Sequence, residues 1–343
     1  MIARAVKQVS IFLDPCNDVL VAWLGRRMIP AIVLSAAMIG GISPARPVIA
    51  QAIAWAAPRP ATKPPFADPQ KFLNAMFEQF LGEGTKDDDQ ALARVPVSAQ
   101  EEQRLGMRTA QAYTDELERR KIRVVTRGKD VQYLQELVET IRSQMKNHDR
   151  YRKIQVRIVD TASTDAHSVP GGTLFFDRGL LDYAGSEAAL VGILGHELSH
   201  LDRGHQLKIL RRIKLAEQTS AGGKGVSPER FMQSGALLMK AFLRPCSPGD
   251  ETEADRDGAA WAYEAGYDPR ELADLFRRLN QRQPERVPGF ADFLRTHPFH
   301  LDRQRAIMDL FSQLQAKSPK DKLYIGRENY RRRITRAERE FKE

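Results

Sequence analysis

The residues most able to do chemistry in this chain are two histidines four positions apart, with a glutamate directly after the first. They read His196-Glu197-Leu198-Ser199-His200 and follow the apolar run 188–195. On a helix both imidazoles project from one face, so they can reach one metal ion, and Glu197 can lie beside a metal-bound water. This spacing predicts the core of a zinc hydrolase site, although so short a string can also arise by chance.

A third histidine nearby, His205, is expected to face away from this site. At about 100° per residue it lies roughly 180° around the helix from His196, whereas His200 lies only about 40° away. The longer pattern HExxHxxGxxH also fails, because Arg203 and Gln206 stand where it requires glycine and histidine. Catalytic zinc usually takes three protein ligands and keeps a position for water. The third ligand is therefore expected farther along the chain.

Two helices must position such a site. Residues 187–201 contain small and branched apolar side chains without proline, and Ser186 offers a capping hydroxyl, which predicts a buried helix. A second helix is expected after the Pro- and Gly-containing segment 244–249. Glu251 and Asp255 would share one face of it, so one could bind the metal while the other orients a histidine. An acid-rich first turn that only complements the helix dipole is the alternative.

Together these motifs resemble a known family. HELSH followed by Glu251-x-x-Ala254-Asp255 is similar to the HExxH plus ExxAD signature of the integral and periplasmic zinc metallopeptidases. That family includes the HtpX heat-shock protease, the CAAX prenyl endopeptidase and the outer-membrane quality-control protease BepA. Residues 169–181 resemble its "PGG, strand, RGLL" segment, and Thr296-His297-Pro298 resembles its "THP". The resemblance covers approximately residues 96–314 and neither end of the chain.

The resemblance implies a ligand set and a mechanism. One Zn²⁺ per chain would be held by His196, His200 and Glu251, with Asp255 orienting a histidine from behind. Glu197 would take a proton from the zinc-activated water and deliver it to the leaving amine. The implied reaction is hydrolysis of a peptide bond without a covalent intermediate.

The same resemblance implies further site residues. His297 would either contact the zinc in a closed, latent state or stabilise the oxyanion, and Arg303 would pair with a site carboxylate or bind substrate. The turn before residues 173–176 predicts an edge strand bordering the cleft, and in the family such a strand receives the substrate. The substrate-contacting residues expected there are Gly172, Thr173, Leu174 and Phe175. A buried hairpin strand without substrate contact is the alternative.

One position departs from the family. Asp165 stands where many relatives have an asparagine ahead of "PGG". An amide can donate a hydrogen bond, whereas an ionised aspartate only accepts, so we expect no oxyanion role for Asp165. His167 is interpreted as a packing or surface residue.

The fold class predicted is α+β, a mainly helical zincin-like metallopeptidase domain with a small β-sheet and an edge strand bordering the active-site cleft. Ser98 to Glu101 reads as a capping box, the run 154–159 alternates as a strand, and residues 131–145 read as a helix. The expected organisation is a signal peptide or N-terminal anchor (1–52), a Pro-rich linker with a short docking segment (53–95), the zinc metallopeptidase domain (96–315) and a charged C-terminal tail (316–343). The tail is expected to be a solvated helix or frayed end.

Charge and composition indicate which classes of binding partner to expect. The net charge of +9 suits an anionic membrane surface or acidic clients without demanding nucleic acid, and the glycine run 221–226 lacks a phosphate-binding pattern, so no nucleotide is expected. Arg26-Arg27, an apolar stretch and small residues up to Ala52 predict export, with a cleaved signal peptide favoured over an uncleaved anchor. A periplasmic or membrane-associated location follows.

Two functions remain open on this evidence. The first is an exported zinc endopeptidase that cuts misfolded or unassembled envelope proteins; its partners would be unfolded substrates, with the membrane surface or outer-membrane assembly machinery as further candidates. The second is a latent or inactive zinc-binding holdase or assembly factor for the same proteins. The intact Glu197 favours the enzyme, because a pure binding module has no need for that base.

Overall fold

The computed structural model describes residues 86–219, 232–242, 244–281, 297 and 301–342. All of them belong to one compact unit, Asp68–Glu343. The predicted signal segment, residues 53–85 of the predicted linker and docking segment, and the glycine run 221–226 lie outside the described residues. Among the helices that the structure does describe, none is long and apolar enough to span a membrane.

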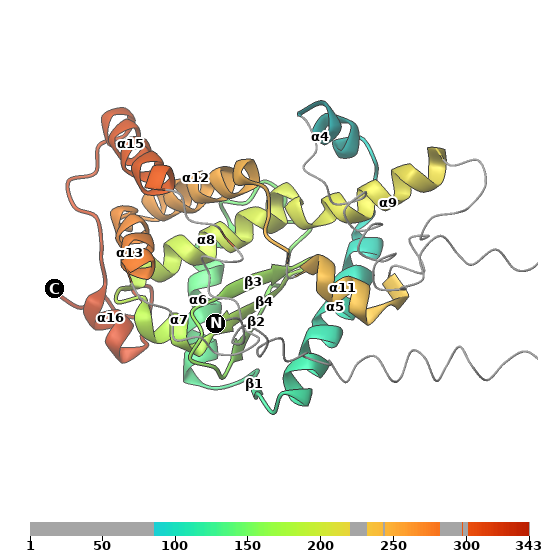
Figure 1. The fold of residues 1–343 in the computed structure, drawn as a ribbon. Helices are drawn as coiled ribbons and strands as arrows, with labels where there is room; N and C mark the ends of the chain where they lie inside the picture. Colours follow the sequence, from blue (N-terminus) through green and yellow to red (C-terminus); the bar gives the residue numbers. More distant parts are fainter. Residues whose placement is uncertain (1–85, 220–231, 243, 282–296, 298–300, 343) are drawn as a thin grey trace, which may run out of the picture. The chain divides into compact units, whose positions relative to one another are not determined.

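Helices surround a small sheet, as predicted (Figure 1). The first part of the described chain holds α4 (Lys86–Ala93), α5 (Ala99–Arg119), β1 (Val124–Val125), α6 (Lys129–Arg142), β2 (Gln155–Val159), β3 (Ala166–Val169) and β4 (Thr173–Asp177). The second part holds α7 (Arg178–Tyr183), α8 (Glu187–Arg203), the 3₁₀ turn η1 (His205–Leu207), α9 (Lys208–Thr219), α11 (Gly235–Phe242), α12 (Pro248–Glu264), α13 (Arg270–Gln281), α15 (Leu301–Lys317) and α16 (Arg327–Arg332). The α+β class is confirmed.

Local sequence signals set the starts of the helices that matter here. Ser98 caps α5 in a complete capping box with Glu101, and Ser186 caps α8 by accepting from the Ala189 amide. Ser247 does the same for α12, which begins at Pro248. Ser98 and Ser186 are the caps that the sequence predicts, whereas α12 begins at Pro248, inside the segment 244–249 that was expected to precede it.

The sheet corrects one prediction. Its strand order is β1-β2-β4-β3, with β4 parallel to β2 and antiparallel to β3. Residues 173–176 therefore form an internal strand, not an edge. The strand that borders α8 is β3, which has no further strand beyond it among the described residues. The edge strand is therefore β3. Residues 166–169 include His167 and Ser168 and do not show the alternation of apolar and polar residues that predicts a strand.

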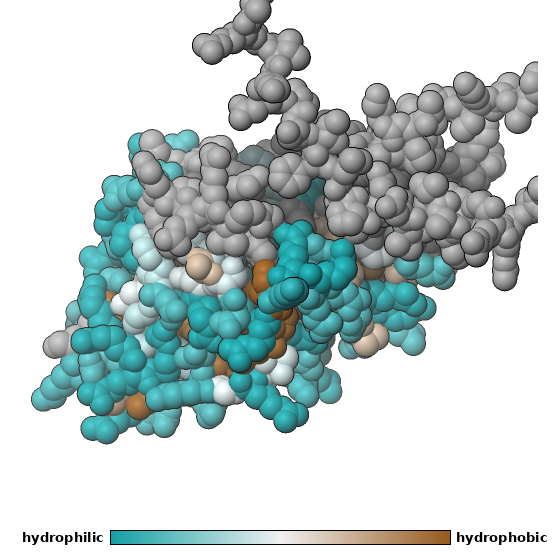
Figure 2. All heavy atoms as spheres, turned by 60° about the horizontal axis from the view of Figure 1, so that its bottom comes forward, coloured by the Kyte–Doolittle hydropathy of each residue, from teal (hydrophilic) through white to brown (hydrophobic). Residues whose placement is uncertain are grey.

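Helix α8 runs between the sheet and the helices α12, α13 and α15 (Figure 1). Every residue from Glu187 to Asp202 is buried, so the histidines sit on a helix without a solvated face. Glycines let α12 approach closely: a Cβ built on Gly195 would lie 2.8 Å from the Cα of Gly258. Figure 2 shows a mostly hydrophilic face with one narrow hydrophobic strip, as expected when the apolar side chains fill the interior.

The C-terminal segment also corrects a prediction, because it is not a solvated or frayed end. Asn329 is fully buried, and Tyr324 and Tyr330 are 4% and 8% exposed. The amide of Ala188, in the first turn of α8, donates to the carbonyl of Ile325 (2.9 Å). The segment is as charged as predicted, but its tyrosines pack in the core beside the start of α8, and the Asn329 side chain bonds within the segment.

Candidate metal centre

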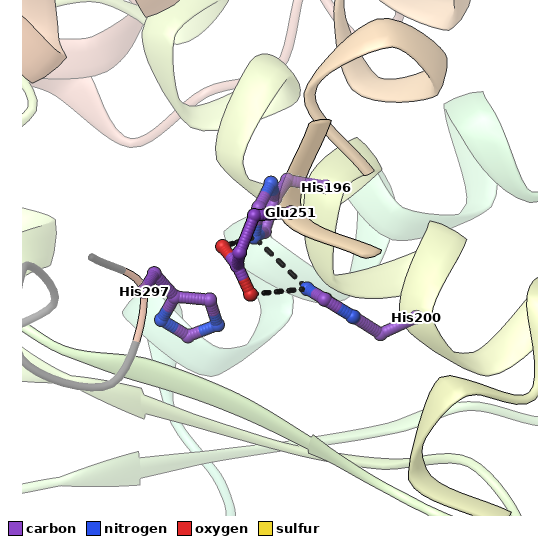
Figure 3. Close-up of side chains that lie close together, drawn as sticks. All are labelled: His196, His200, Glu251 and His297. Carbon is purple, nitrogen blue, oxygen red and sulfur yellow. Dashed lines mark hydrogen bonds and ion pairs between the residues drawn. The ribbon is translucent and has the colours of Figure 1, made fainter. Parts of the chain in front are cut away.

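Helix α8 places two imidazoles side by side. The Nε2 atoms of His196 and His200 lie 3.1 Å apart, and both side chains are buried (Figure 3). Burial is the main cause that lowers the pKa of each histidine well below its usual value. Both rings are therefore held neutral, which is the form that binds a metal ion.

Helix α12 brings a carboxylate to the same point. The Oε2 atom of Glu251 lies 3.5 Å from Nε2 of His196, and its Oε1 atom lies 3.6 Å from Nε2 of His200 (Figure 3). Burial raises the pKa of Glu251 to about 7. Among the described residues neither oxygen finds a hydrogen-bond partner of good geometry, although Nη1 of Arg303 lies 3.1 Å from Oε2.

This set of donors fits a divalent metal ion. Ligand-type atoms of His196, His200, Glu251 and His297 all lie within 4.8 Å of one another. Two imidazoles and a carboxylate are the ligands of many catalytic zinc sites. A cation between them would supply the partner that the buried oxygens of Glu251 otherwise lack. The residues predicted as metal ligands are thus brought together by the fold.

Asp255 stands behind the first histidine. Its Oδ1 atom lies 2.9 Å from Nδ1 of His196, as expected for a residue that orients a ligand. Arg303 then holds Asp255, donating from Nε to Oδ2 (2.5 Å) and from Nη2 to Oδ1 (2.7 Å). Of the two roles expected for Arg303, pairing with a site carboxylate is the one that the geometry shows, and its side chain is buried.

Glu197 and His297 face each other across the site. Oε2 of Glu197 accepts from the backbone N–H of Ser168 in β3 (2.8 Å), and its Oε1 atom lies 3.3 Å from Nε2 of His297. Burial alone would lower the pKa of His297, but the carboxylates of Glu251 and Glu197 outweigh burial and raise this pKa to about 9. His297 thus lies beside the candidate ligands, and its two expected roles stay predictions.

The residues predicted to contact substrate, 172–175, belong to an internal strand and not to the edge of the sheet. Leu174 and Phe175 are buried, and the ring of Phe175 packs edge-on against Tyr113 at 4.8 Å. Because β4 is hydrogen-bonded on both sides, it offers no edge to a peptide in the described structure. Gly172 and Thr173 only begin that strand. The prediction that residues 172–175 form a substrate-binding edge is therefore wrong, because the edge strand on this side of the sheet is β3.

Sequence reasoning missed three residues of the site. Ser168 binds Glu197 through its backbone, so its side-chain type carries no signal. His167 lies 2.9 Å from Asp165 and stacks on His297 at 6.1 Å between ring centroids. His205 contacts His200 because α8 ends at Gly204, whose φ of +68° breaks the helical register that was assumed. That glycine, a common helix terminator, was the available signal.

The fold and this donor set, two histidines and a glutamate with a second glutamate beside them, form the arrangement expected of a metallopeptidase centre. Residues 129–310 match the model of peptidase family M48, and the chain belongs to that family. The predicted family and the predicted enzyme class, a zinc metallopeptidase, are confirmed by this match.

Several curated proteins share this region. The mitochondrial metalloendopeptidase OMA1 of Schizosaccharomyces pombe is 27% identical over 168 residues, covering 48% of this chain and 49% of its own. The beta-barrel assembly-enhancing protease of Yersinia pestis is 28% identical over 151 residues, covering 41% and 31%. That of Escherichia coli is 25% identical over 157 residues, covering 41% and 31%. The chain therefore spans a third to a half of the length of these relatives.

Proposed function

We propose that this protein is a zinc-dependent endopeptidase that hydrolyses peptide bonds of misfolded or unassembled envelope proteins. The observation that carries the proposal is the position of Glu197: its buried carboxylate lies next to the candidate ligand set, where a general base has to stand. Its Oε1 atom lies 3.3 Å from Nε2 of His297 and makes no hydrogen bond of good geometry among the described residues.

Each residue of the site would have one role in this reaction. His196, His200 and Glu251 would hold the zinc, which when bound lowers the pKa of water and polarises the scissile carbonyl. The N–H of Ser168 holds Oε2 of Glu197, leaving Oε1 to accept a proton and later donate it to the leaving amine. Asp255 and Arg303 keep His196 in one orientation.

An extended peptide is the substrate form that suits this site. The backbone of β3 runs past Glu197, and one side of this strand faces away from β4. A peptide lying along this side would pass the candidate metal ligands. It would have to displace the side chains that now bind the outward groups of Ser168, whose N–H donates to Glu197 and whose carbonyl accepts from Gln206. Unfolded or misassembled proteins expose such segments, and folded ones do not.

The envelope as the place of action rests on two supports. The first is the order of basic, apolar and small residues at 26–52, which is typical of an export signal. The second is the similarity to proteins named beta-barrel assembly-enhancing protease. Both favour a periplasmic or membrane-associated enzyme with envelope proteins as clients, and the outer-membrane assembly machinery or the membrane surface as neighbours.

A latent holdase is the second candidate, and the position of His297 favours it. Its Nε2 atom lies 3.3 Å from the base Glu197 and within the same group as the metal ligands. In this closed arrangement the histidine occupies the space that water and substrate need. A protein held permanently in this form would bind zinc and clients without cutting them.

Cleavage of unfolded casein by the purified protein separates the candidates. We expect the wild type to cut it, a zinc chelator to stop the cutting, and Glu197→Gln to lower kcat/KM at least 100-fold, the range seen when a general base is removed. Glu118→Gln, the same change at an exposed position, should behave like the wild type. No cleavage by the wild type or by His297→Ala would favour the holdase, and equal cleavage by Glu197→Gln would overturn the mechanism.

A further inference from the structure

His205 lies behind the second metal-binding histidine. Its Nδ1 atom is 2.9 Å from Nδ1 of His200, and the two rings meet nearly edge-to-face, with centroids 5.0 Å apart. The ring reaches this place because Gly204, in a left-handed conformation, ends α8 and turns the chain into η1. His205 is itself buried, at 6% exposure.

The contact requires one donor and one acceptor. A histidine that binds a metal through Nε2 keeps its hydrogen on Nδ1, so His200 must donate. Nδ1 of His205 must then accept, which leaves its own hydrogen on Nε2. That Nε2 atom lies 3.4 Å from Oε2 of Glu253 and 3.7 Å from Oδ1 of Asp250, two acceptors on the first turns of α12.

We propose that His205 is a positioning residue for zinc: it accepts the Nδ1 hydrogen of His200, fixes the tautomer and ring plane of that ligand, and is itself oriented by Glu253. The proposal rests on the proposed zinc site. It means that the two histidine ligands are supported differently. His196 is backed by the carboxylate of Asp255, and His200 by an imidazole.

The carboxylates behind His205 are anchored in turn. Asp250 accepts from Nζ of Lys208 (2.7 Å), and Glu253 accepts from Nη1 of Arg203 (3.0 Å). Both cations lie just before or just after η1 in sequence, so the turn that carries His205 is fastened to α12 at both ends. A loss of these contacts would free the ring of His200 to rotate, which weakens a metal site without removing a ligand.

Zinc affinity tests this role directly. We expect His205→Phe, which keeps the ring but removes the acceptor, to weaken zinc binding about 10- to 100-fold in a competition with a chromogenic chelator. His205→Asn, whose amide oxygen can accept where Nδ1 does, should regain at least part of that loss. Thermal unfolding of each metal-free variant shows whether it is folded.

Glu253→Ala is a second test, which leaves the buried ring of His205 unchanged. The Glu253 side chain is 53% exposed, so its removal opens no buried cavity. It should weaken zinc binding several-fold. Asp257→Ala is the matched control: Asp257 is the other acidic partner of Arg203, but it binds Ser199 instead of His205. It should retain the zinc affinity of the wild type.

The outcomes separate this role from the proposed function. Wild-type zinc affinity in both His205→Phe and Glu253→Ala overturns the proposal, and so does an equal loss in His205→Phe and His205→Asn, because packing alone would then explain it. A weakened Phe variant with a restored Asn variant supports it. A wild type that binds zinc but cuts no peptide contradicts the endopeptidase and leaves the comparison of affinities valid.

Discussion

Arg303 is the residue on which the charge balance of the centre depends. Its guanidinium donates two hydrogen bonds to Asp255 and lies 3.1 Å from an oxygen of Glu251, and all three side chains are buried. Burial raises the pKa of Asp255, and the nearby guanidinium offsets only part of that rise. The arginine thus allows a negative charge to stand behind His196 inside the protein.

Replacing Arg303 by Met should therefore leave Asp255 buried without its partner. We expect the metal-free protein to lose about 3–5 kcal/mol of unfolding free energy, the usual cost of breaking a buried ion pair from one side. Urea denaturation measures it. Arg305→Met, at an exposed position of the same helix, should change the unfolding free energy by less than about 0.5 kcal/mol. Equal stability of the two variants would contradict the role assigned to Arg303.

At the scale of elements, the distance between α8 and α12 decides whether the ligands meet. Gly258 lies two turns after Glu251 on α12 and packs on the backbone of α8 next to His196. A Cβ on Gly258 would lie 2.7 Å from the carbonyl oxygen of Gly192 and 2.8 Å from the amide nitrogen of His196. Backbone atoms cannot yield as a flexible side chain does, so the helices would have to separate.

Gly258→Ala should accordingly destabilise the protein by about 1–3 kcal/mol, the range for overpacking, and weaken zinc binding because Glu251 moves with its helix. The measurements are thermal unfolding and chelator competition. Gly249→Ala is the control on the same helix, since a Cβ there would meet only the Ser247 hydroxyl, at 3.8 Å. If Gly258→Ala bound zinc as well as Gly249→Ala does, helix spacing would not limit the site.

A second element-scale prediction concerns the start of α5. Glu101 completes the capping box with Ser98 and accepts from Nζ of Lys214 on α9 (2.9 Å). The bond from Lys214 is the main cause that lowers the pKa of Glu101 to about 2. A lowered folded-state pKa contributes stability that is present above the unfolded pKa and is lost as the pH falls through the folded pKa.

We therefore expect the wild type to exceed Glu101→Gln in unfolding free energy by about 1 kcal/mol at pH 6, a value reduced for solvent screening. The difference should shrink between about pH 4.5 and pH 2. Denaturant titrations across this range test it, with Glu118→Gln as the control on the same helix. A difference that stays constant with pH would show that the pair with Lys214 contributes nothing through ionisation.

At the scale of the whole described unit, the C-terminal segment closes onto the start of α8. Asn329 is its centre: the amide donates to the carbonyls of Ile334 (2.8 Å) and Arg339 (2.6 Å), and it accepts from the Tyr324 hydroxyl and the amide of Phe341. The buried carboxylate of Glu187, the first residue of α8, accepts from the amide of Arg336 (2.9 Å). Helix α8 is thus secured by the C-terminal segment.

Asn329→Ala should leave several of these groups unpaired and cost about 2–4 kcal/mol, since each buried group without its partner costs about 1–3 kcal/mol. Because Ala188 binds Ile325, we also expect faster hydrogen exchange at the amide of Ala188. Glu338→Ala, at an exposed position of the same segment, is the control. Unchanged exchange at Ala188 in the asparagine variant would refute the coupling between the C-terminal segment and α8.

Local patterns were enough to predict the ligand-bearing parts of this protein. The i, i+4 spacing of His196 and His200, the acids at the start of α12 and the hydroxyls of Ser98 and Ser186 act within one or two helical turns, where geometry follows from adjacent residues. The resemblance of ordered motifs indicated Glu251 as the third ligand. The α+β class could also be predicted, because helix and strand patterns act over a few neighbouring residues.

Only the tertiary structure decided what surrounds those ligands. The edge position of β3, the contact of His205 with His200 and the burial of Asn329 depend on partners far along the chain or on one left-handed glycine, and such pairings leave no periodic trace in the sequence. The sequence by itself indicated which residues could bind a metal ion and which could activate a water molecule beside it. The packing of α8 between the sheet and α12 determined how those residues are oriented, because hydrogen bonds and close backbone contacts form only between elements already in place.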